Sequence, residues 1–101
     1  MNYEKIKKEI KEFVDERHWE QFHTPKNLSM ALSVEASELL EIFQWQKAEE
    51  YKSATDEQKE MIRDEIADIF YYIVRISDKL DINIEDALIN KMKKNRKKYP
   101  K

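Results

Sequence analysis

The chain has 101 residues, of which 40% are charged and 41% hydrophobic, and its formal net charge is −2. It contains no glycine and no cysteine, which excludes disulfides, thiolate sites and the glycine-rich phosphate loops of Walker-type and dinucleotide-binding proteins. With only two prolines, this composition indicates a single all-α domain over residues 1–101. No stretch approaches the ~18 apolar residues of a membrane span, and the N-terminus has no apolar leader, so we expect a soluble cytoplasmic protein with no membrane partner.

Apolar residues recur at helical spacing in four stretches of the chain. The predicted helices span residues 3 to about 20, Pro25 to about Lys47, the segment after Thr55 to about Leu80, and Ile84 to about Lys97. Thr24 is predicted to cap the second helix, and Thr55 with Gln58 fits a capping box at the start of the third. Asn83 is predicted to cap the fourth helix, and the polar stretch 48–54 is predicted to be a connection.

The third predicted helix has an apolar surface that is wider than one face. Its isoleucines form a straight stripe, and Phe70, Tyr71 and Val74 extend the apolar surface to the side. In so short a chain, a helix of this kind is expected to be covered by its own chain on one side and by a second subunit on the other. We therefore expect a four-helix bundle-like fold that is completed by oligomerisation.

Four acidic residues form two pairs at helical spacing, Glu35-x-x-Glu38 and, after 26 intervening residues, Glu65-x-x-Asp68. The two carboxylates of each pair project from the same side of one turn. Glu35 lies in the middle of an apolar stripe, where an ionised carboxylate is costly unless it is paired or bound to a metal. Two helices that each bring two such carboxylates to a shared interior would form an oxygen-rich site suited to Mg²⁺.

These acids also have simpler interpretations. Taken singly, Glu38, Glu41 and Asp68 are explained as ordinary solvated helix surface, since the chain has 21 acidic residues. For Glu35 the structural alternative is a buried salt bridge to Lys91 or Arg75, although such pairs are costly to desolvate.

The fourth predicted helix carries the opposite anomaly, because Lys91 and Asn95 interrupt the apolar stripe of Ile84, Leu88 and Met92. The lysine either extends its stem over the core to reach solvent or binds a phosphate near the carboxylates. Asn95 offers both a donor and an acceptor, which suits a sugar hydroxyl or a base edge.

Three aromatic side chains flank the second predicted helix. Phe22 and His23 precede it, and Trp45 stands at its far end. A loop histidine is usually a surface residue and an aromatic is usually part of a core. A pocket in which these rings stack on a nucleobase is the functional alternative.

Three segments carry a resemblance to a known family: FHTPKNLSMALSVEASELLEIFQW, DEIADIFYYIVRI and KMKKNRKKYP. Together they resemble the MazG-type all-α nucleotide pyrophosphohydrolases over roughly residues 19–100, and are most similar to the single-domain branch that includes dCTP pyrophosphatase. The family motif, E-x-x-E followed after a variable gap by E-x-x-D, matches the two acidic pairs. The resemblance implies hydrolysis of a nucleoside triphosphate to the monophosphate and pyrophosphate, by homodimers or by tetramers built from two dimers.

The resemblance also assigns residues to roles. It implies that Mg²⁺, for which Mn²⁺ could substitute, is bound by Glu35, Glu38, Glu65 and Asp68. It implies that the nucleotide is contacted by His23, Asn27, Trp45, Tyr72, Lys91 and Asn95, with Lys26 as a further candidate. Bound metal would let the acidic site accept a triphosphate and would acidify a water for attack at the α-phosphorus. Glu38 or Glu41 is expected to orient or deprotonate that water, and Lys91 to offset phosphate charge.

The expected role is house-cleaning of the nucleotide pool, with a dCTP-like or noncanonical pyrimidine substrate, although related enzymes act on other nucleotides. A non-enzymatic helical interaction module, with its acids solvated and its isoleucine stripe paired, is the competing class. RNA binding through KMKKNRKK is a third hypothesis. The net charge of −2 and the preference of lysine for helix C-termini favour a solvated helix end instead, so nucleic acid is not an expected partner.

Overall fold

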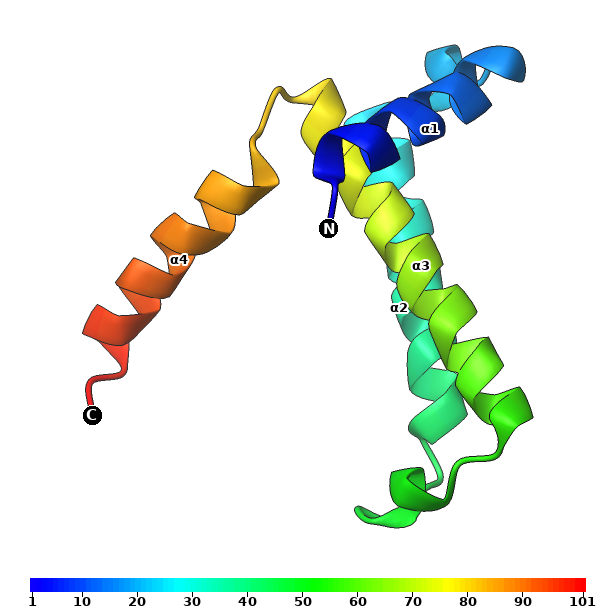
Figure 1. Ribbon diagram of the computed structural model, residues 1–101, viewed down its shortest axis with the longest axis vertical. Coiled ribbons are helices and arrows are strands. Elements are labelled where there is room, and N and C mark those ends of the chain that lie inside the picture. The colour runs from blue at the N-terminus through cyan, green and yellow to red at the C-terminus, as the bar shows by residue number, and fades with distance from the viewer.

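The computed structural model describes all of residues 1–101, which fold into α-helices and short 3₁₀ helices without any strand (Figure 1). The elements are α1 (Tyr3–Glu16), η1 (Glu20–Phe22), α2 (Pro25–Phe43), η2 (Glu50–Ser53), α3 (Asp56–Lys79) and α4 (Ile84–Lys98). The predicted all-α class and the order of the four main helices are confirmed. No helix combines the length and the apolar character that crossing a membrane requires.

The predicted caps form the starts of the three later helices. The Thr24 hydroxyl accepts a hydrogen bond from the Asn27 backbone N–H, and the Asn83 side chain accepts one from the Asp86 backbone N–H. At the start of α3, Thr55 forms the full capping box with its partner three residues later. Each cap satisfies backbone groups that the first helical turn leaves unpaired, and is worth about 1 kcal/mol.

The first two helices end earlier than the sequence predicted. α1 ends at Glu16 because His18 adopts a left-handed backbone conformation with a φ of 56°, which turns the chain away from the helix. Asp81, with a φ of 54°, ends α3 in the same way. Histidine and aspartate are among the residues that tolerate this conformation in a chain without glycine. After α2, the Gln46 N–H bonds to the carbonyl of Phe43 at 2.9 Å, so a tight turn replaces the next helical turn.

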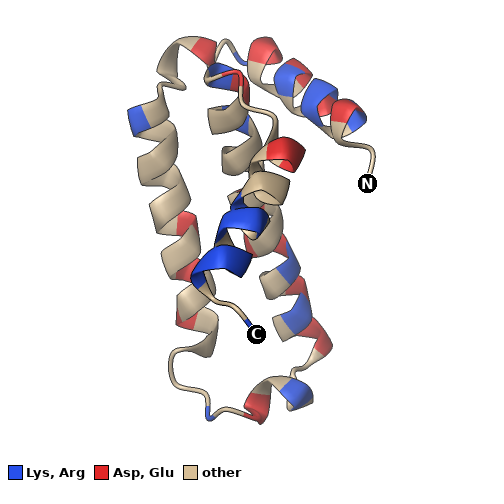
Figure 2. Cartoon of the chain, turned by 90° about the vertical axis from the view of Figure 1, so that its left-hand side faces the viewer, with Lys and Arg blue, Asp and Glu red and all other residues tan.

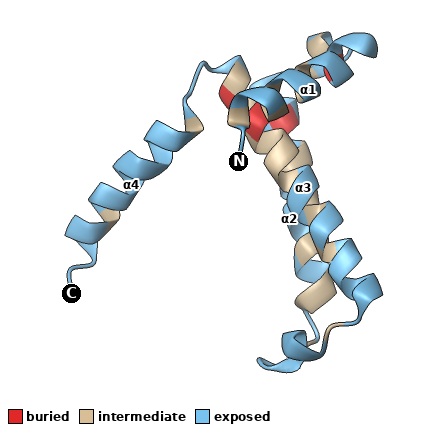
Figure 3. Ribbon diagram, in the orientation of Figure 1, coloured by how far each residue is buried: buried red, intermediate tan, exposed pale blue.

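The body of the protein is an antiparallel pair of α2 and α3, and α1 lies across the end of α3 (Figure 1). The buried residues lie where these three helices meet (Figure 3). They are Val14 of α1, Leu28 of α2, and Val74, Arg75 and Ser77 of α3. Only these five side chains of the chain are buried, so a single subunit excludes little apolar surface from water.

Helix α4 stands apart from the other helices (Figures 1 and 3). Its apolar side chains Leu88, Ile89 and Met92 are 61%, 48% and 41% exposed. Within one chain, therefore, three helices pack together and the fourth extends outward. Figure 2 shows the basic residues of α4 gathered toward its C-terminus, whereas the acids of α2 lie in the half that leads into the connection to α3.

Candidate active site

Three carboxylates converge between α2 and α3. Glu35 and Glu38 lie one turn apart on α2, and Glu65 faces them from α3. One carboxylate oxygen from each residue lies within 4.8 Å of the others. The Oε2 atoms of Glu35 and Glu65 are buried, and no group of the protein donates a hydrogen bond to them. Buried polar atoms are nearly always satisfied in proteins, so this cluster requires a partner that the chain does not supply.

The proximity of these acids changes their protonation. The pKa of Glu35 is raised to about 7, chiefly because its carboxyl can share a proton with Glu65, and further by burial and by the negative charge of Glu38. The pKa of Glu65 is also raised. The possibility of sharing a proton with Glu35 lowers it, but burial and the carboxylates of Glu38 and Asp68 outweigh that effect. Like charges at this distance are therefore relieved by a shared proton or by a cation.

A cavity of about 710 Å³ opens beside the cluster, between α1 and the α2–α3 pair. Its wall contains the aromatic rings of Phe13, Trp19, Phe70, Tyr71 and Tyr72. Several rings meet edge to face, with centroids 5.6 Å apart for Phe13 and Trp19 and 5.0 Å apart for Tyr71 and Tyr72. Glu35 and Asp68 lie in the same wall, so the cavity adjoins the acids. Its volume and its aromatic lining are typical of a site for a small molecule.

The outer acids lie on either side of the cluster. Asp68 follows Glu65 by one turn of α3 and borders the aromatic cavity, but it is not one of the three converging carboxylates. Glu41 follows Glu38 by one turn of α2 and borders a second cavity of about 580 Å³. The acids that line this second cavity are Glu38, Glu41, Asp64 and Glu65. The cluster thus separates an aromatic cavity from an acidic one.

His23 and Tyr72 both line the aromatic cavity. The Nδ1 atom of His23 accepts a hydrogen bond of 3.2 Å from Nε of Arg75, and its ring lies 6.3 Å from that of Trp19. Burial, and then the positive charge of Arg75, lower the pKa of His23. The pKa of Tyr72 is raised by burial and by the nearby carboxylates of Glu35 and Asp68, so its hydroxyl keeps its proton.

The residues at the two ends of α2 do not share a pocket within one chain. His23 precedes the helix, and Trp45 follows it and is 88% exposed. A helix of 19 residues spans roughly 28 Å, so rings at its two ends cannot meet. Phe22 is exposed and lies outside the aromatic cavity. The Asn27 side chain donates to the Phe22 carbonyl at 3.0 Å, which braces the entry to α2.

The remaining predicted contacts lie outside this region. Lys26, in the first turn of α2, is exposed. Lys91 is exposed and Asn95 partly exposed on α4, which stands apart from the α2–α3 pair that carries the acids (Figure 1). The structure therefore brings Glu35, Glu38 and Glu65 together, and leaves the two α4 residues remote from them.

The salt bridge considered for Glu35 is absent. Arg75 pairs instead with Glu20 and Asp78, at 2.7 Å and 3.3 Å. Its guanidinium projects toward η1 and α1, whereas Glu65 and Asp68 lie two to three turns earlier on α3. The alternative interpretation of Glu35 as the partner of Arg75 is therefore wrong.

The sequence analysis missed most of the aromatic wall. Tyr71 was assigned to the wide apolar surface of the third predicted helix, and Phe13 and Trp19 were given no role in a binding site. A signal was present in the spacing of Ile6, Ile10 and Phe13, which places them on one side of α1. That side lines the cavity rather than a sealed core. Which of these two environments an apolar stripe meets depends on how α1 crosses α3.

The fold and site define an all-α protein in which a helix pair presents a carboxylate cluster beside an aromatic cavity. Residues 30–101 match the MazG-like family, and the chain belongs to this family. The family resemblance inferred from the acidic pairs and the flanking segments is confirmed.

The chain is also similar in sequence or structure to individual pyrophosphatases. Over 99 residues the chain is 37% identical to dCTP pyrophosphatase 1 of Bos taurus and 35% identical to that of Homo sapiens. These alignments cover 96% of this chain but 59% and 58% of the relatives, so the chain spans about three fifths of their length. The crystal structure of a pyrophosphatase from Archaeoglobus fulgidus is 39% identical and superposes with a TM-score of 0.92, covering 100% of this chain and 94% of that chain.

Proposed function

We propose that this protein is a metal-dependent nucleoside triphosphate pyrophosphohydrolase, which cleaves its substrate at the α-phosphorus into a monophosphate and pyrophosphate. The observation that carries the proposal is the cluster of three carboxylates, two of them with buried unpartnered oxygens, beside an aromatic cavity of about 710 Å³. The similarity to proteins named dCTP pyrophosphatase 1 and pyrophosphatase supports this reaction.

The acidic cluster fits a divalent cation. The Oε2 atoms of Glu35 and Glu65 lack donors inside the protein, and carboxylate oxygens are the ligands that hard cations prefer. We assign Glu35, Glu38, Glu65 and Asp68 as the residues that would hold Mg²⁺, with Mn²⁺ as a substitute. Bound there, such ions neutralise a triphosphate and lower the pKa of a coordinated water.

In this proposal the aromatic cavity binds the nucleobase, and residues that border the acidic cavity act on the attacking water. The aromatic cavity would bind the base by stacking, with His23 and Tyr72 as polar contacts. Because Glu35 and Asp68 border the same cavity, a base held there leaves its phosphates next to the cluster. Glu38 or Glu41, on the acidic side, would orient or deprotonate the attacking water.

The substrate class we propose is a pyrimidine deoxynucleotide of the dCTP type or a noncanonical relative. The name of the curated relatives supports this choice. The physiological role that follows is removal of such nucleotides from the pool.

The exposed α4 suggests how Lys91 and Asn95 would reach the site. We propose that the chain forms a homodimer, or a tetramer of two dimers, in which α4 packs against a neighbouring subunit. The exposed apolar side chains of α4 and the few buried residues of the single chain support this. The basic C-terminal half of α4 complements the acidic cluster, so Lys91 of one subunit could offset phosphate charge at the site of another.

A panel assay tests the reaction. The protein is incubated with Mg²⁺ and individual nucleoside triphosphates, including modified and deoxy forms, and the products are separated by ion-exchange chromatography. Monophosphate plus pyrophosphate, lost with EDTA, is the expected result. Diphosphate plus orthophosphate would contradict attack at the α-phosphorus, and no turnover on any substrate would favour the interaction module. Glu12→Gln, which alters an exposed acid of α1 without an ion pair, is the control for Glu35→Gln.

A further inference from the structure

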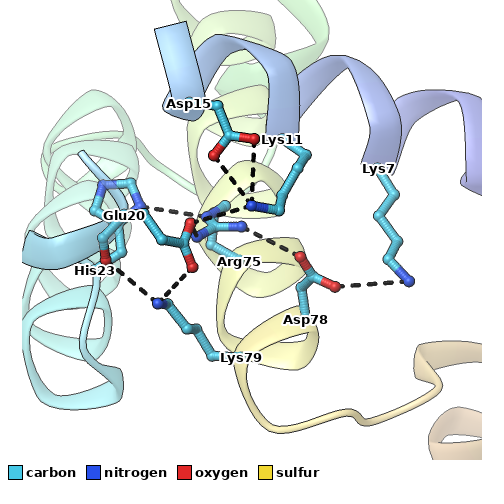
Figure 4. A network of polar contacts seen from close by, with 8 residues as sticks. All are labelled: Lys7, Lys11, Asp15, Glu20, His23, Arg75, Asp78 and Lys79. Carbon is cyan, nitrogen blue, oxygen red and sulfur yellow. Dashed lines mark hydrogen bonds and ion pairs between the residues drawn. The ribbon is translucent and has the colours of Figure 1, made fainter. Parts of the chain in front are cut away.

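Arg75 is buried although it carries a full charge, with 1% of its side chain exposed. Each part of its guanidinium has a partner (Figure 4). Nη2 donates to Glu20 at 2.7 Å, Nη1 donates to Asp78 at 3.3 Å, and Nε donates to Nδ1 of His23 at 3.2 Å. The carboxylates of Glu20 and Asp78 balance the positive charge of Arg75. The third contact is with His23, which lines the aromatic cavity.

Three lysines brace the two carboxylates that hold Arg75. Lys79 and Lys11 pair with Glu20, and Lys7 pairs with Asp78 at 3.6 Å. The network ties α1 and η1 to the C-terminal half of α3 (Figure 4). A guanidinium held on several sides has little freedom to rotate, so its Nε–H points at His23 in a fixed direction.

This contact decides where the proton of His23 lies. The Nε of arginine carries a hydrogen and no available lone pair, so it can only donate. Nδ1 of His23 must therefore be the unprotonated nitrogen, and the neutral ring carries its proton on Nε2. An imidazolium would place a second hydrogen against Arg75. Inside the chain no acceptor is bonded to Nε2, and the residue lines the aromatic cavity.

We propose that Arg75 is a positioning residue that fixes His23 as the Nε2–H tautomer, so that His23 donates a hydrogen bond to an acceptor atom of the nucleobase in the aromatic cavity. This inference rests on the proposed function for the presence of a base. A pyrimidine presents such an acceptor in its ring carbonyl, which a cytosine carries next to its ring nitrogen. The protein would then discriminate against bases that lack this acceptor, because binding such a base would leave the Nε2–H donor of His23 unpaired.

The tautomer is measured without any enzymatic assay. Long-range ¹H–¹⁵N NMR spectra of the full chain distinguish protonated from unprotonated ring nitrogens. His23 should show an unprotonated Nδ1 and a protonated Nε2 across neutral pH. His18 provides an internal reference signal, because it is exposed and no side chain of the protein fixes the tautomer of its ring. A protonated Nδ1 on His23 would overturn the proposal.

The connection to the base is measured with dCMP, which carries the base without the triphosphate. Addition of dCMP should shift the His23 Nε2 signal, and Arg75→Lys should weaken dCMP binding about 3- to 10-fold, the value of one hydrogen bond. Arg63→Lys, an exposed arginine of the same helix, is the matched control and should leave binding unchanged. The absence of any dCMP-induced shift at His23 would contradict its role as a donor.

A double-mutant cycle separates positioning from a general structural role. If Arg75 acts through His23, Arg75→Lys should have no further effect on dCMP binding in a His23→Phe background. Additive effects would refute the proposal. His23→Phe leaves the Glu20 and Asp78 pairs intact, so it remains informative if Arg75→Lys lowers stability. In turnover assays Arg75→Lys should raise KM with little change in kcat. Failure of turnover alone would overturn the proposed function, whereas the NMR and dCMP results decide the role of Arg75.

Discussion

The acidic cluster should make Glu35→Gln more stable than the natural protein in the absence of metal, while turnover is lost. Glutamine has the same shape as glutamate, removes one negative charge, and can donate a hydrogen bond to the unpartnered Oε2 of Glu65. Two charges at 4.8 Å, the outer limit of the oxygen separations in the cluster, repel by about 0.9 kcal/mol at the dielectric of water and by about 3.5 kcal/mol at an effective dielectric of 20. The cavities on both sides admit solvent, so the lower part of this range applies.

We therefore expect a gain of about 1 kcal/mol, which corresponds to a rise in Tm of about 4–8 °C for a domain of this size. The assay is thermal unfolding in EDTA at about pH 8, above the pKa of Glu35, at one fixed protein concentration because association would also shift Tm. Mg²⁺ should raise the Tm of the natural protein and have a smaller effect on Glu35→Gln. Glu12→Gln should leave both values unchanged. A lower Tm for Glu35→Gln in EDTA, or an undiminished response to Mg²⁺, would refute the reasoning.

Three further predictions concern stability and assembly. The hydrogen bond from Lys79 holds the pKa of Glu20 at about 2, below its ordinary value of 4.5, so its stabilisation is fully present above pH 4.5 and is lost as the pH falls toward 2. The Tm of the natural protein should therefore fall more steeply than that of Glu20→Gln between these pH values, and parallel curves would contradict this. Leu88→Asp should convert an oligomer into a monomer by light scattering and reduce turnover, whereas Asn90→Asp on the same helix should not; a natural protein that is already monomeric would exclude the shared site. Thr55→Ala should cost about 1 kcal/mol through loss of the capping box, measured by denaturant unfolding, and an unchanged midpoint would show that packing alone fixes this helix start.

The stability prediction for Glu35 has a functional meaning. Acids that repel one another in the metal-free protein bind a cation with a gain that includes relief of this repulsion. In a fully solvated acidic surface the carboxylates repel one another little, so cation binding would gain nothing from relief of repulsion. The sign of the effect of Glu35→Gln therefore discriminates a metal centre from the helical interaction module, even before a substrate is known.

The sequence by itself determined the features that depend on short-range interactions. Caps such as Thr24 and Asn83 act on backbone groups within three residues, so the helix starts were predictable from neighbouring residues. The carboxylate pairs followed from the 3.6-residue period, and the position of Glu35 within an apolar stripe indicated an unusual environment. The helix ends were harder to predict, because glycine, the usual signal for a left-handed residue after a helix, is absent, and His18 and Asp81 adopt this conformation instead.

The tertiary structure alone decided which distant residues meet. Arg75 contacts His23 and Glu20 across 52 and 55 positions of the sequence, and no local period encodes such a pair. The aromatic cavity likewise exists because α1 crosses the α2–α3 pair, which brings Phe13 toward Tyr71. The sequence specified the periodicity of each helix, whereas the angle and position at which helices cross depend on the packing of whole surfaces. That packing placed an aromatic cavity beside the acids and left most of α4 away from the other helices.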